Sequence, residues 1–317
     1  MKRTALMVVA ALAVVAALPG TAAAQQYPAK PITMFCWSQA GSPADVFARM
    51  VAKLLAVELG QNVVVEQRVG GNGIILVNSL LRAPADGYTL GAITLTLATL
   101  FSEPAANFKP DDLQFIARSQ VDPFGLFVHA STPFRTLEEF IAFARKKPNF
   151  VNVGGPFQMS AHRVTWEVFS EAAKIKTTWV PYNGGGPTTI AVAGGHVDAA
   201  ATNPGAVKPM IAAGKVRVLA FSSDKRLEDF PDIPTYKERG FDIVRYQWRG
   251  VMARAGTPRA AVDRVASAMQ RAQQKPEWKE HLRHISLLEG YLGPEEFRAQ
   301  VLRDKEEVEA VKKRLGL

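Results

Sequence analysis

The hydrophobic positions of the N-terminal third fall into short apolar runs that alternate with amphipathic segments. Residues 32–37 and 63–65 are apolar runs typical of buried strands, and residues 46–59 between them have helical spacing. A second amphipathic segment covers residues 74–81, and a further strand opens at Tyr88. This order of strand, helix, strand, helix and strand predicts a parallel sheet with right-handed crossovers.

The same alternation returns in the middle of the chain and then changes near the C-terminus. Further strands are predicted at residues 115–117, 125–128, 151–153, 179–182, 197–200 and 216–220. Residues 246–252 form an apolar run that we expect to return to the first sheet, before helices that begin at Pro258, Pro276 and Pro294. The pattern predicts an α/β chain in which residues 126–246 form a second domain inserted into a first domain made of residues 25–125 and 247–317. A small ligand is expected in the cleft between two such domains.

The turn after the first predicted strand is the main candidate site. It reads Ser38-Gln39-Ala40-Gly41-Ser42-Pro43-Ala44-Asp45. Ser42 is a predicted N-cap, Pro43 the first helical residue and Asp45 the acidic partner of a capping box. A helix N-terminus exposes backbone N–H groups and the positive end of a dipole, which favours a carboxylate or phosphate. Turns of this kind are also common as purely structural features.

A second turn resembles the first in its place after a strand. We expect a strand at residues 151–153, then a turn at Gly154-Gly155-Pro156 and a helix from about Ala161. Because strand carboxyl ends face an interdomain cleft, the turns at Gly41 and Gly154 are predicted to oppose each other.

The N-terminus has the features of a cleaved secretory signal. Lys2 and Arg3 precede an apolar run at residues 5–18, and an A-x-A exit follows at residues 22–24. We therefore expect residues 1–24 to be a signal peptide and the mature protein to be soluble and exported, with cleavage near Ala24. The net charge of +9, or +7 without Lys2 and Arg3, is scattered, with no basic stripe, so nucleic-acid binding is not predicted.

Residues with reactive side chains give no enzyme signature. Cys36 is the only cysteine and lies in an apolar run, where a buried packing role is favoured over a nucleophile. His281 and His284 have ligand-like spacing but no nearby cysteine partner, so no metal site is predicted. We predict no cofactor and no catalytic residue. Asp45 and His162 would be the candidate bases if the chain were an exported enzyme.

The motifs together resemble the receptors of the tripartite tricarboxylate transporters, also called Bug proteins. The resemblance rests on residues in the order Tyr27-Pro28-x-Lys30-Pro31-Ile32, Gly41 with Asp45 and Ala48-Arg49, Leu59-Gly60-Gln61-x-Val63-Val64-Val65-Glu66, Pro84-x-Asp86-Gly87-Tyr88-Thr89-Leu90, Val180-Pro181-Tyr182-x-Gly184, Gly194-Gly195-x-Val197-Asp198, Gly214-Lys215, Lys225-Arg226, Pro231-Asp232-Ile233-Pro234-Thr235 and Ala255-Gly256-Thr257-Pro258. Each motif is short, but the ordered set covers nearly the whole mature chain.

This resemblance implies a two-domain periplasmic-binding-protein fold, similar to type II, that closes on a ligand. It implies that a ligand carboxylate lies between the two turns, held largely by backbone N–H groups and ordered water. It also implies delivery to integral-membrane transporter subunits, and we expect a monomer. The predicted ligand-binding residues are Trp37, Ser38, Gln39, Ala40, Gly41, Ser42, Asp45, Gly154, Gly155, Pro156, Phe157 and Asn203.

Both turns depart from the pattern of the family. The stretch Cys36-Trp37-Ser38 stands where the family has Val-Pro-Phe or Val-Pro-Tyr, and Gly154-Gly155-Pro156 with Phe157 replaces a Ser-Ser-Gly start. Trp37 and Phe157 as pocket walls would favour an aromatic or larger apolar carboxylate over a di- or tricarboxylate; core packing of both rings is the alternative. The leading prediction is a solute-binding protein for a small organic carboxylate. The alternatives are an exported enzyme and a receptor that signals to a membrane sensor.

Overall fold

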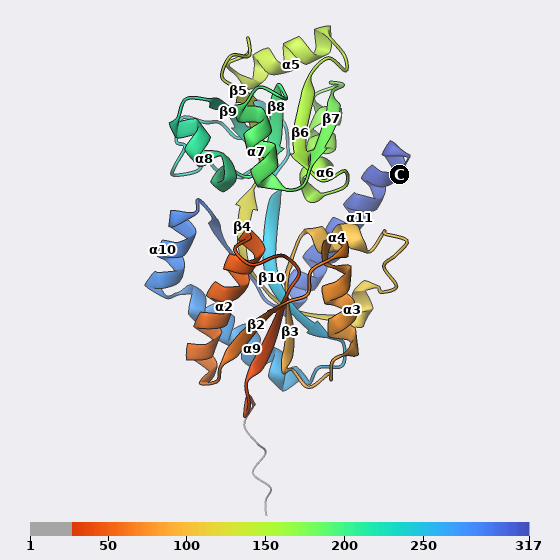
Figure 1. Cartoon of the computed structure of the whole chain (residues 1–317), viewed down its shortest axis with the longest axis vertical. Helices are drawn as coiled ribbons and strands as arrows, with labels where there is room; N and C mark the ends of the chain where they lie inside the picture. The colour runs from red at the N-terminus through yellow and green to blue at the C-terminus, as the bar shows by residue number, and fades with distance from the viewer. Residues whose placement is uncertain (1–26, 317) are drawn as a thin grey trace, which may run out of the picture.

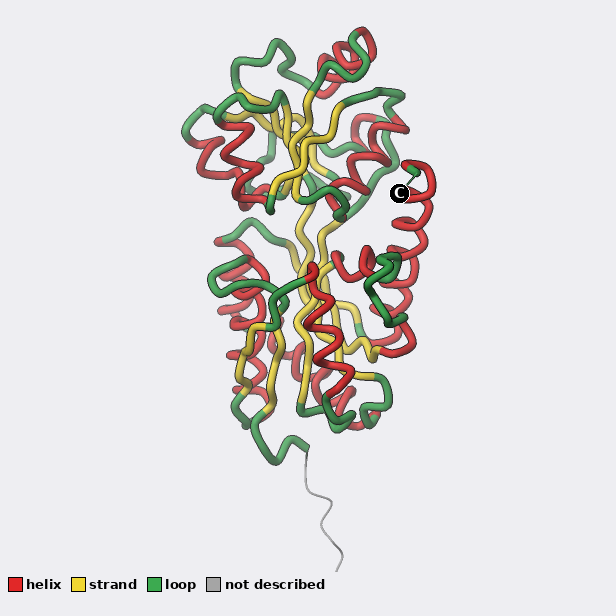
Figure 2. The backbone as a smooth tube through the Cα atoms, turned by 45° about the vertical axis from the view of Figure 1, so that its right-hand side comes forward, coloured by secondary structure: helices red, strands yellow, loops and turns green. Residues whose placement is uncertain are grey.

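A computed structural model describes residues 27–316 (Figure 1). The predicted signal peptide, residues 1–24, lies outside the described residues. Two sheets with helices packed against them form two α/β bodies joined end to end, as predicted (Figures 1 and 2). Within residues 27–316 no helix combines the length and the apolar character needed to span a bilayer.

The first sheet has six strands in the order β11-β4-β10-β3-β1-β2. Its strands are β1 (Ile32–Cys36), β2 (Val63–Gln67), β3 (Thr89–Thr94), β4 (Leu113–Pro123), β10 (Tyr246–Arg254) and β11 (Leu288–Leu292). The helices and 3₁₀ turns of this body are α2 (Pro43–Leu59), η1 (Gly71–Gly73), α3 (Ile74–Arg82), α4 (Thr96–Leu100), η2 (Pro110–Asp112), α9 (Arg259–Gln273), α10 (Pro276–His284) and α11 (Pro294–Leu315). Strand β1 pairs in parallel with β2 and β3, whereas β10 runs antiparallel to β3 and β4. The sequence predicted the parallel part but neither α4 nor β11.

The second sheet has five strands in the order β7-β6-β8-β5-β9. Its strands are β5 (Gly125–His129), β6 (Asn152–Pro156), β7 (Thr178–Tyr182), β8 (Ala199–Thr202) and β9 (Val216–Phe221). The helices and the 3₁₀ turn of this body are α5 (Leu137–Lys146), α6 (Ala161–Ala172), α7 (Gly185–Ala193), α8 (Pro204–Ala212) and η3 (Lys237–Arg239).

The side chains of β1 show why the first sheet forms. Ile32, Met34 and Cys36 alternate onto one face and are fully buried against the apolar stripe of α2, which includes Phe47 and Leu55. The fully buried Cys36 has the packing role that the sequence predicted. The helix ends at Gly60, whose φ of 69° is the left-handed C-cap predicted after Leu59.

Within residues 27–316 the chain passes between the two sheets at two places. It leaves the first sheet between Pro123 of β4 and Gly125 of β5, and it returns between Phe221 of β9 and Tyr246 of β10. Strands β4 and β10 are paired along their length up to Tyr246 and Pro123, so the connection is a two-stranded ribbon (Figure 1). The exact domain limits at residues 125 and 246 remain a prediction.

Contacts beside the ribbon also join the two bodies. On one side α11 extends along α6, and Arg314 of α11 pairs with Glu171 of α6 (Figure 1). On the other side Lys208 of α8 donates to Ser286 Oγ, just after α10, at 3.1 Å. The two bodies therefore touch on both sides of the connecting strands.

Candidate functional site

The first predicted turn folds as a capped helix start. Ser42 is the N-cap of α2, and its Oγ accepts the Asp45 N–H at 3.2 Å, as predicted. The other half of the predicted capping box is wrong, because the Asp45 carboxylate accepts the N–H of Gly41, at 2.9 Å, and not that of Ser42. The Ser42 N–H donates instead to the carbonyl of Gln39, at 3.2 Å.

Asp45 is the centre of this turn. Its side chain is buried, and besides the Gly41 N–H it accepts from Arg49 Nε at 2.9 Å and Gln67 Nε2 at 2.8 Å. Burial pushes the pKa of Asp45 up, but the hydrogen bonds from Arg49, Gly41 and Gln67 together hold that pKa below its usual value. The carboxylate of Asp45 is thus ionised and fully engaged, which does not favour a role as a catalytic base.

In this structure the amides of Gly41 and Ser42, which the sequence predicts as ligand donors, are both hydrogen-bonded within the chain, so their part in ligand binding stays a prediction. The protein's own groups, Asp45 and Gln39, already accept both N–H groups. Trp37, at the end of β1, is half-buried and packs against both hydrophobic cores of the first body. Ser38 is half-buried, and Gln39 and Ala40 are exposed, so their part in ligand binding stays a prediction.

The prediction of a second turn at Gly154, Gly155 and Pro156 is wrong, because these three residues lie in a strand. They belong to β6, where Gly154 pairs with Val180 and Gly155 with Pro181 of β7. A Cβ on Gly155 would lie 2.0 Å from Cη2 of Trp179, so close packing of that indole ring explains the glycine. The turn itself spans residues 157–160.

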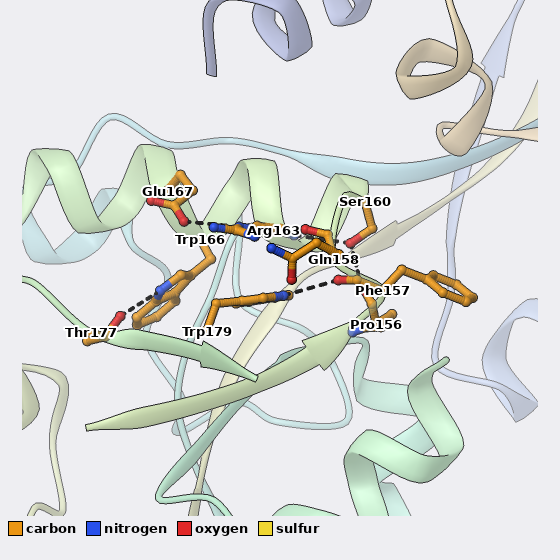
Figure 3. A network of polar contacts seen from close by, with 9 residues as sticks. All are labelled: Pro156, Phe157, Gln158, Ser160, Arg163, Trp166, Glu167, Thr177 and Trp179. Atoms are coloured by element: carbon orange, nitrogen blue, oxygen red, sulfur yellow. Dashed lines mark hydrogen bonds and ion pairs between the residues drawn. The ribbon is translucent and has the colours of Figure 1, made fainter. Parts of the chain in front are cut away.

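A network of polar contacts holds the turn at residues 157–160 (Figure 3). Trp179 Nε1 donates to the carbonyl of Phe157 at 3.1 Å, and Arg163 Nη1 donates to the carbonyl of Gln158 at 3.0 Å. Ser160 caps α6 by accepting the Arg163 N–H, at 3.3 Å. Phe157 has a φ of 55°, and its ring points away from Trp179 (Figure 3). Whether Phe157 lines a ligand pocket remains a prediction.

Asn203 joins the second body to the ribbon. Its Nδ2 donates to the carbonyl of Pro123 at 3.0 Å, so its Oδ1 faces Nε2 of His162, at 2.6 Å. An amide oxygen only accepts, hence Nε2 of His162 carries the proton in this arrangement. Burial lowers the pKa of His162 to about 4, helped by the positive charge of Arg249, so the ring is neutral at physiological pH. Both polar atoms of the predicted ligand-binding Asn203 are therefore already engaged.

Sequence reasoning missed the most unusual charges of the molecule, Arg249 of β10 and Asp122 of β4. Both are buried, and Arg249 Nη2 lies 3.4 Å from Asp122 Oδ2. Burial raises the pKa of Asp122 to about 7, against the opposing effect of the Arg249 charge. Burial likewise lowers the pKa of Arg249. The sequence does contain one sign of this pair, a single arginine within the apolar run at residues 246–252. A buried charge is costly there unless an opposite charge or a ligand pairs with it.

Strand pairing places Arg249 at the edge where ligands of α/β sheets bind. Arg249 is opposite Thr94, the last residue of β3, and β3 is parallel to β1, which ends at Cys36. The carboxyl ends of such strands form the usual ligand crevice. The second body meets the end of β4 nearby, where Asn203 Nδ2 donates to the carbonyl of Pro123.

The histidine pair near the C-terminus has no metal-holding partners among the described residues. His281 of α10 is half-buried, and burial lowers its pKa. In the described part of the chain, no three His, Cys, Asp or Glu side chains are placed to hold a metal ion together.

Comparisons with known proteins place the chain among receptors. The model of a family described as tripartite tricarboxylate transporter family receptor matches residues 47–315. A protein of Cupriavidus necator, described as the UPF0065 protein in the gbd 5′ region, is 30% identical over 303 residues, which are 95% of this chain and 92% of that protein. 

Solved structures agree with this result. A TctC solute-binding protein from Polaromonas superposes with a TM-score of 0.80 at 27% identity, covering 91% of this chain and 99% of that one. An R. palustris protein solved with adipate gives a TM-score of 0.80 at 26% identity, covering 92% and 98%.

Proposed function

We propose a function on the basis of the family: the chain belongs to the tripartite tricarboxylate transporter receptor family, whose members are periplasmic solute-binding proteins. It captures a small organic carboxylate between its two domains and delivers it to the membrane subunits of a transporter. The mature protein, without residues 1–24, acts in the periplasm as a monomer.

The observation that carries this proposal is the position of Arg249. A buried guanidinium stands at the carboxyl ends of the first sheet's parallel strands, and the second domain contributes Asn203, which bonds Pro123 of β4, and His162, which bonds Asn203. A cation at this place favours an anionic ligand, because a carboxylate pairs with a guanidinium through charge-assisted hydrogen bonds. The R. palustris relative solved with adipate supports a carboxylate as the ligand.

Domain closure is the proposed mechanism. Two paired strands are the only covalent path between the bodies within residues 27–316, so bending of this ribbon can open and close the crevice. Contacts such as Lys208 with Ser286 lie beside the ribbon and would form or break in that movement.

Isothermal titration calorimetry with succinate, malate, adipate and benzoate tests the proposal. We expect at least one of these carboxylates to bind with micromolar or tighter affinity, and small-angle scattering to show compaction on saturation. Succinamide, which has the same carbon chain as succinate but no charge, is the control and should not bind. Failure of every carboxylate, or binding without compaction, would contradict the proposal. Preference for benzoate would support Trp37 and Phe157 as walls of the pocket.

The fate of the ligand distinguishes a receptor from the alternative, an exported enzyme. A receptor returns its ligand unchanged, whereas an enzyme converts it. Proton NMR of a bound carboxylate after prolonged incubation with the protein measures this directly. Co-purification from membranes distinguishes a transporter from a sensor kinase as the partner.

A further inference from the structure

Four polar side chains occupy one face of the ribbon that joins the domains. Arg249 lies directly opposite Gln120, and Gln247 directly opposite Asp122, in the antiparallel pairing of β10 with β4. Residues two apart on a strand share a face, so all four project to the same side. The intervening Trp248 and Val121 pack on the other face, in the hydrophobic core beside α11. We call these four residues the polar ribbon face.

The polar ribbon face is deeply buried and poorly satisfied. The exposed fraction is 0% for Gln120, 4% for Asp122, 7% for Gln247 and 8% for Arg249. Within the described residues, hydrogen-bond partners are lacking for Gln120 Nε2 and Oε1, Asp122 Oδ1, Gln247 Oε1 and Arg249 Nε. Leaving one buried polar atom without a partner costs about 1–3 kcal/mol, so these five call for partners from outside the chain, which ordered water or a ligand can supply.

The chemistry of these atoms describes what that partner carries. Arg249 Nε and Gln120 Nε2 are donors, which suit a carboxylate. Asp122 Oδ1, Gln120 Oε1 and Gln247 Oε1 are acceptors, which require a donor on the ligand. Arg249 Nη2 and Asp122 Oδ2 are 3.4 Å apart, so the guanidinium and the carboxylate can meet an acceptor and a donor that lie close together on one ligand.

We propose that the polar ribbon face is a ligand subsite that takes a carboxylate with a hydroxyl or ammonium group on the adjacent carbon. Arg249 binds the carboxylate, and Asp122 with Gln247 accepts from the adjacent donor. This inference rests on the proposed function. It adds that these side chains select among carboxylates by the group on the adjacent carbon. A plain saturated diacid leaves the three acceptors unpaired, and a site with unpaired buried polar groups discriminates strongly against such a ligand.

The test compares malate and succinate, which differ by one hydroxyl group, by isothermal titration at pH 8. At this pH the carboxyl of Asp122, with a pKa of about 7, is mainly ionised. We expect the wild-type protein to bind malate at least ten-fold more tightly than succinate, and aspartate to share this advantage through its ammonium group. Arg249→Gln should weaken malate binding at least 100-fold. Asp122→Leu should bring malate and succinate within about two-fold of each other, by removing the acceptor.

Arg254→Gln is the matched control, because Arg254 lies on the same strand but is exposed and binds the carbonyl of Ala83. It should leave both affinities unchanged. If Arg249→Gln does not fold, Gln247→Met carries the test and should reduce the malate preference. Equal wild-type affinities for malate and succinate would overturn this inference and leave the proposed function standing. A ligand affinity that survives Arg249→Gln within three-fold would overturn this inference and also the role of Arg249 in the proposed function. Binding of no carboxylate at all would overturn both.

Discussion

Asp45 and Asp122 are two buried carboxylates of the same domain, and they differ in how many hydrogen-bond partners surround them. Asp45 begins α2 and accepts three hydrogen bonds, from Gly41, Arg49 and Gln67. Asp122, next to the last residue of β4, lies near Arg249 and Asn203 and keeps Oδ1 without a hydrogen-bond partner in the described chain. The pKa of Asp45 is lowered, whereas that of Asp122 is raised to about 7.

The difference shows that burial alone does not define the role of a charge. Asp45 is a structural anion that fills the helix N-terminus from within the chain, which is the place where the sequence predicted a ligand. Asp122 and Arg249 are held in the interior at a cost in free energy that the fold itself does not recover. Incomplete satisfaction is therefore the better sign of a binding site than the presence of a helix N-terminus.

The largest expected effect comes from removing the satisfied carboxylate. Asp45→Ala should lower the free energy of unfolding by about 2–3 kcal/mol, because Gln67 loses its partner and α2 loses a cap contact. Urea unfolding followed by circular dichroism measures this. Arg49→Ala is the control, and it should cost less than Asp45→Ala because the Arg49 side chain is half exposed. A similar loss in both variants would contradict the assigned role of Asp45.

Removing the unsatisfied pair should have a smaller effect on stability, of the opposite sign. The double variant Asp122→Leu with Arg249→Met replaces a poorly paired buried ion pair by apolar groups, which is commonly neutral or stabilising, and we expect a gain of at most about 1 kcal/mol. The same urea experiment should give an equal or higher midpoint, while carboxylate binding is lost. A clear drop in stability would show that the pair serves the fold, as Asp45 does.

The dependence of stability on pH separates Asp122 from His162. The pKa of Asp122 is higher in the folded state, so its contribution favours folding at low pH and is lost as the pH rises from about 4 to about 7. The pKa of His162 is lowered from 6.5 to about 4, so its contribution is present above pH 6.5 and is lost as the pH falls toward 4. The two contributions oppose each other between pH 4 and 6.5.

Single substitutions should expose each contribution. Relative to wild type, Asp122→Asn should make stability rise with pH over this window, by at most about 1.4 kcal/mol per pH unit. His162→Gln should make it fall over the same window. Thermal melts between pH 4 and 7 test both signs, and parallel curves for the two variants would contradict the assignment.

The smallest effect is expected at Trp37, which comes just before the Asp45 turn in the sequence. Like Asp122, Trp37 has a buried polar atom, its Nε1, without a hydrogen-bond partner among residues 27–316. Trp37→Phe removes this donor and some packing, so the two effects should nearly cancel, to within about 1 kcal/mol. Ser42→Ala, which removes a satisfied cap, should cost about 1 kcal/mol in the same assay.

Local chemistry explains what the sequence could and could not predict. The cap at Ser42 and the helix end at Gly60 depend on neighbouring residues, and both were predictable. The turn at Gly154 was not, because the glycine at 155 is required by Trp179 across the ladder and not by a bend in the chain. Arg249 and Asp122 lie 127 residues apart, and only the register of β10 against β4 brings them together. No local pattern could have paired them.

The position of β10 between β3 and β4 also sets the order in which the molecule can fold. The second sheet is built from one continuous stretch, from β5 to β9, so its strands can pair as soon as that stretch is available. The first sheet waits for residues 246–254, since its strands β3 and β4 meet only through β10. Long-range pairing of this kind slows folding. The inserted domain should therefore form first, and the arrival of Arg249 beside Asp122 should be among the late steps that complete the protein.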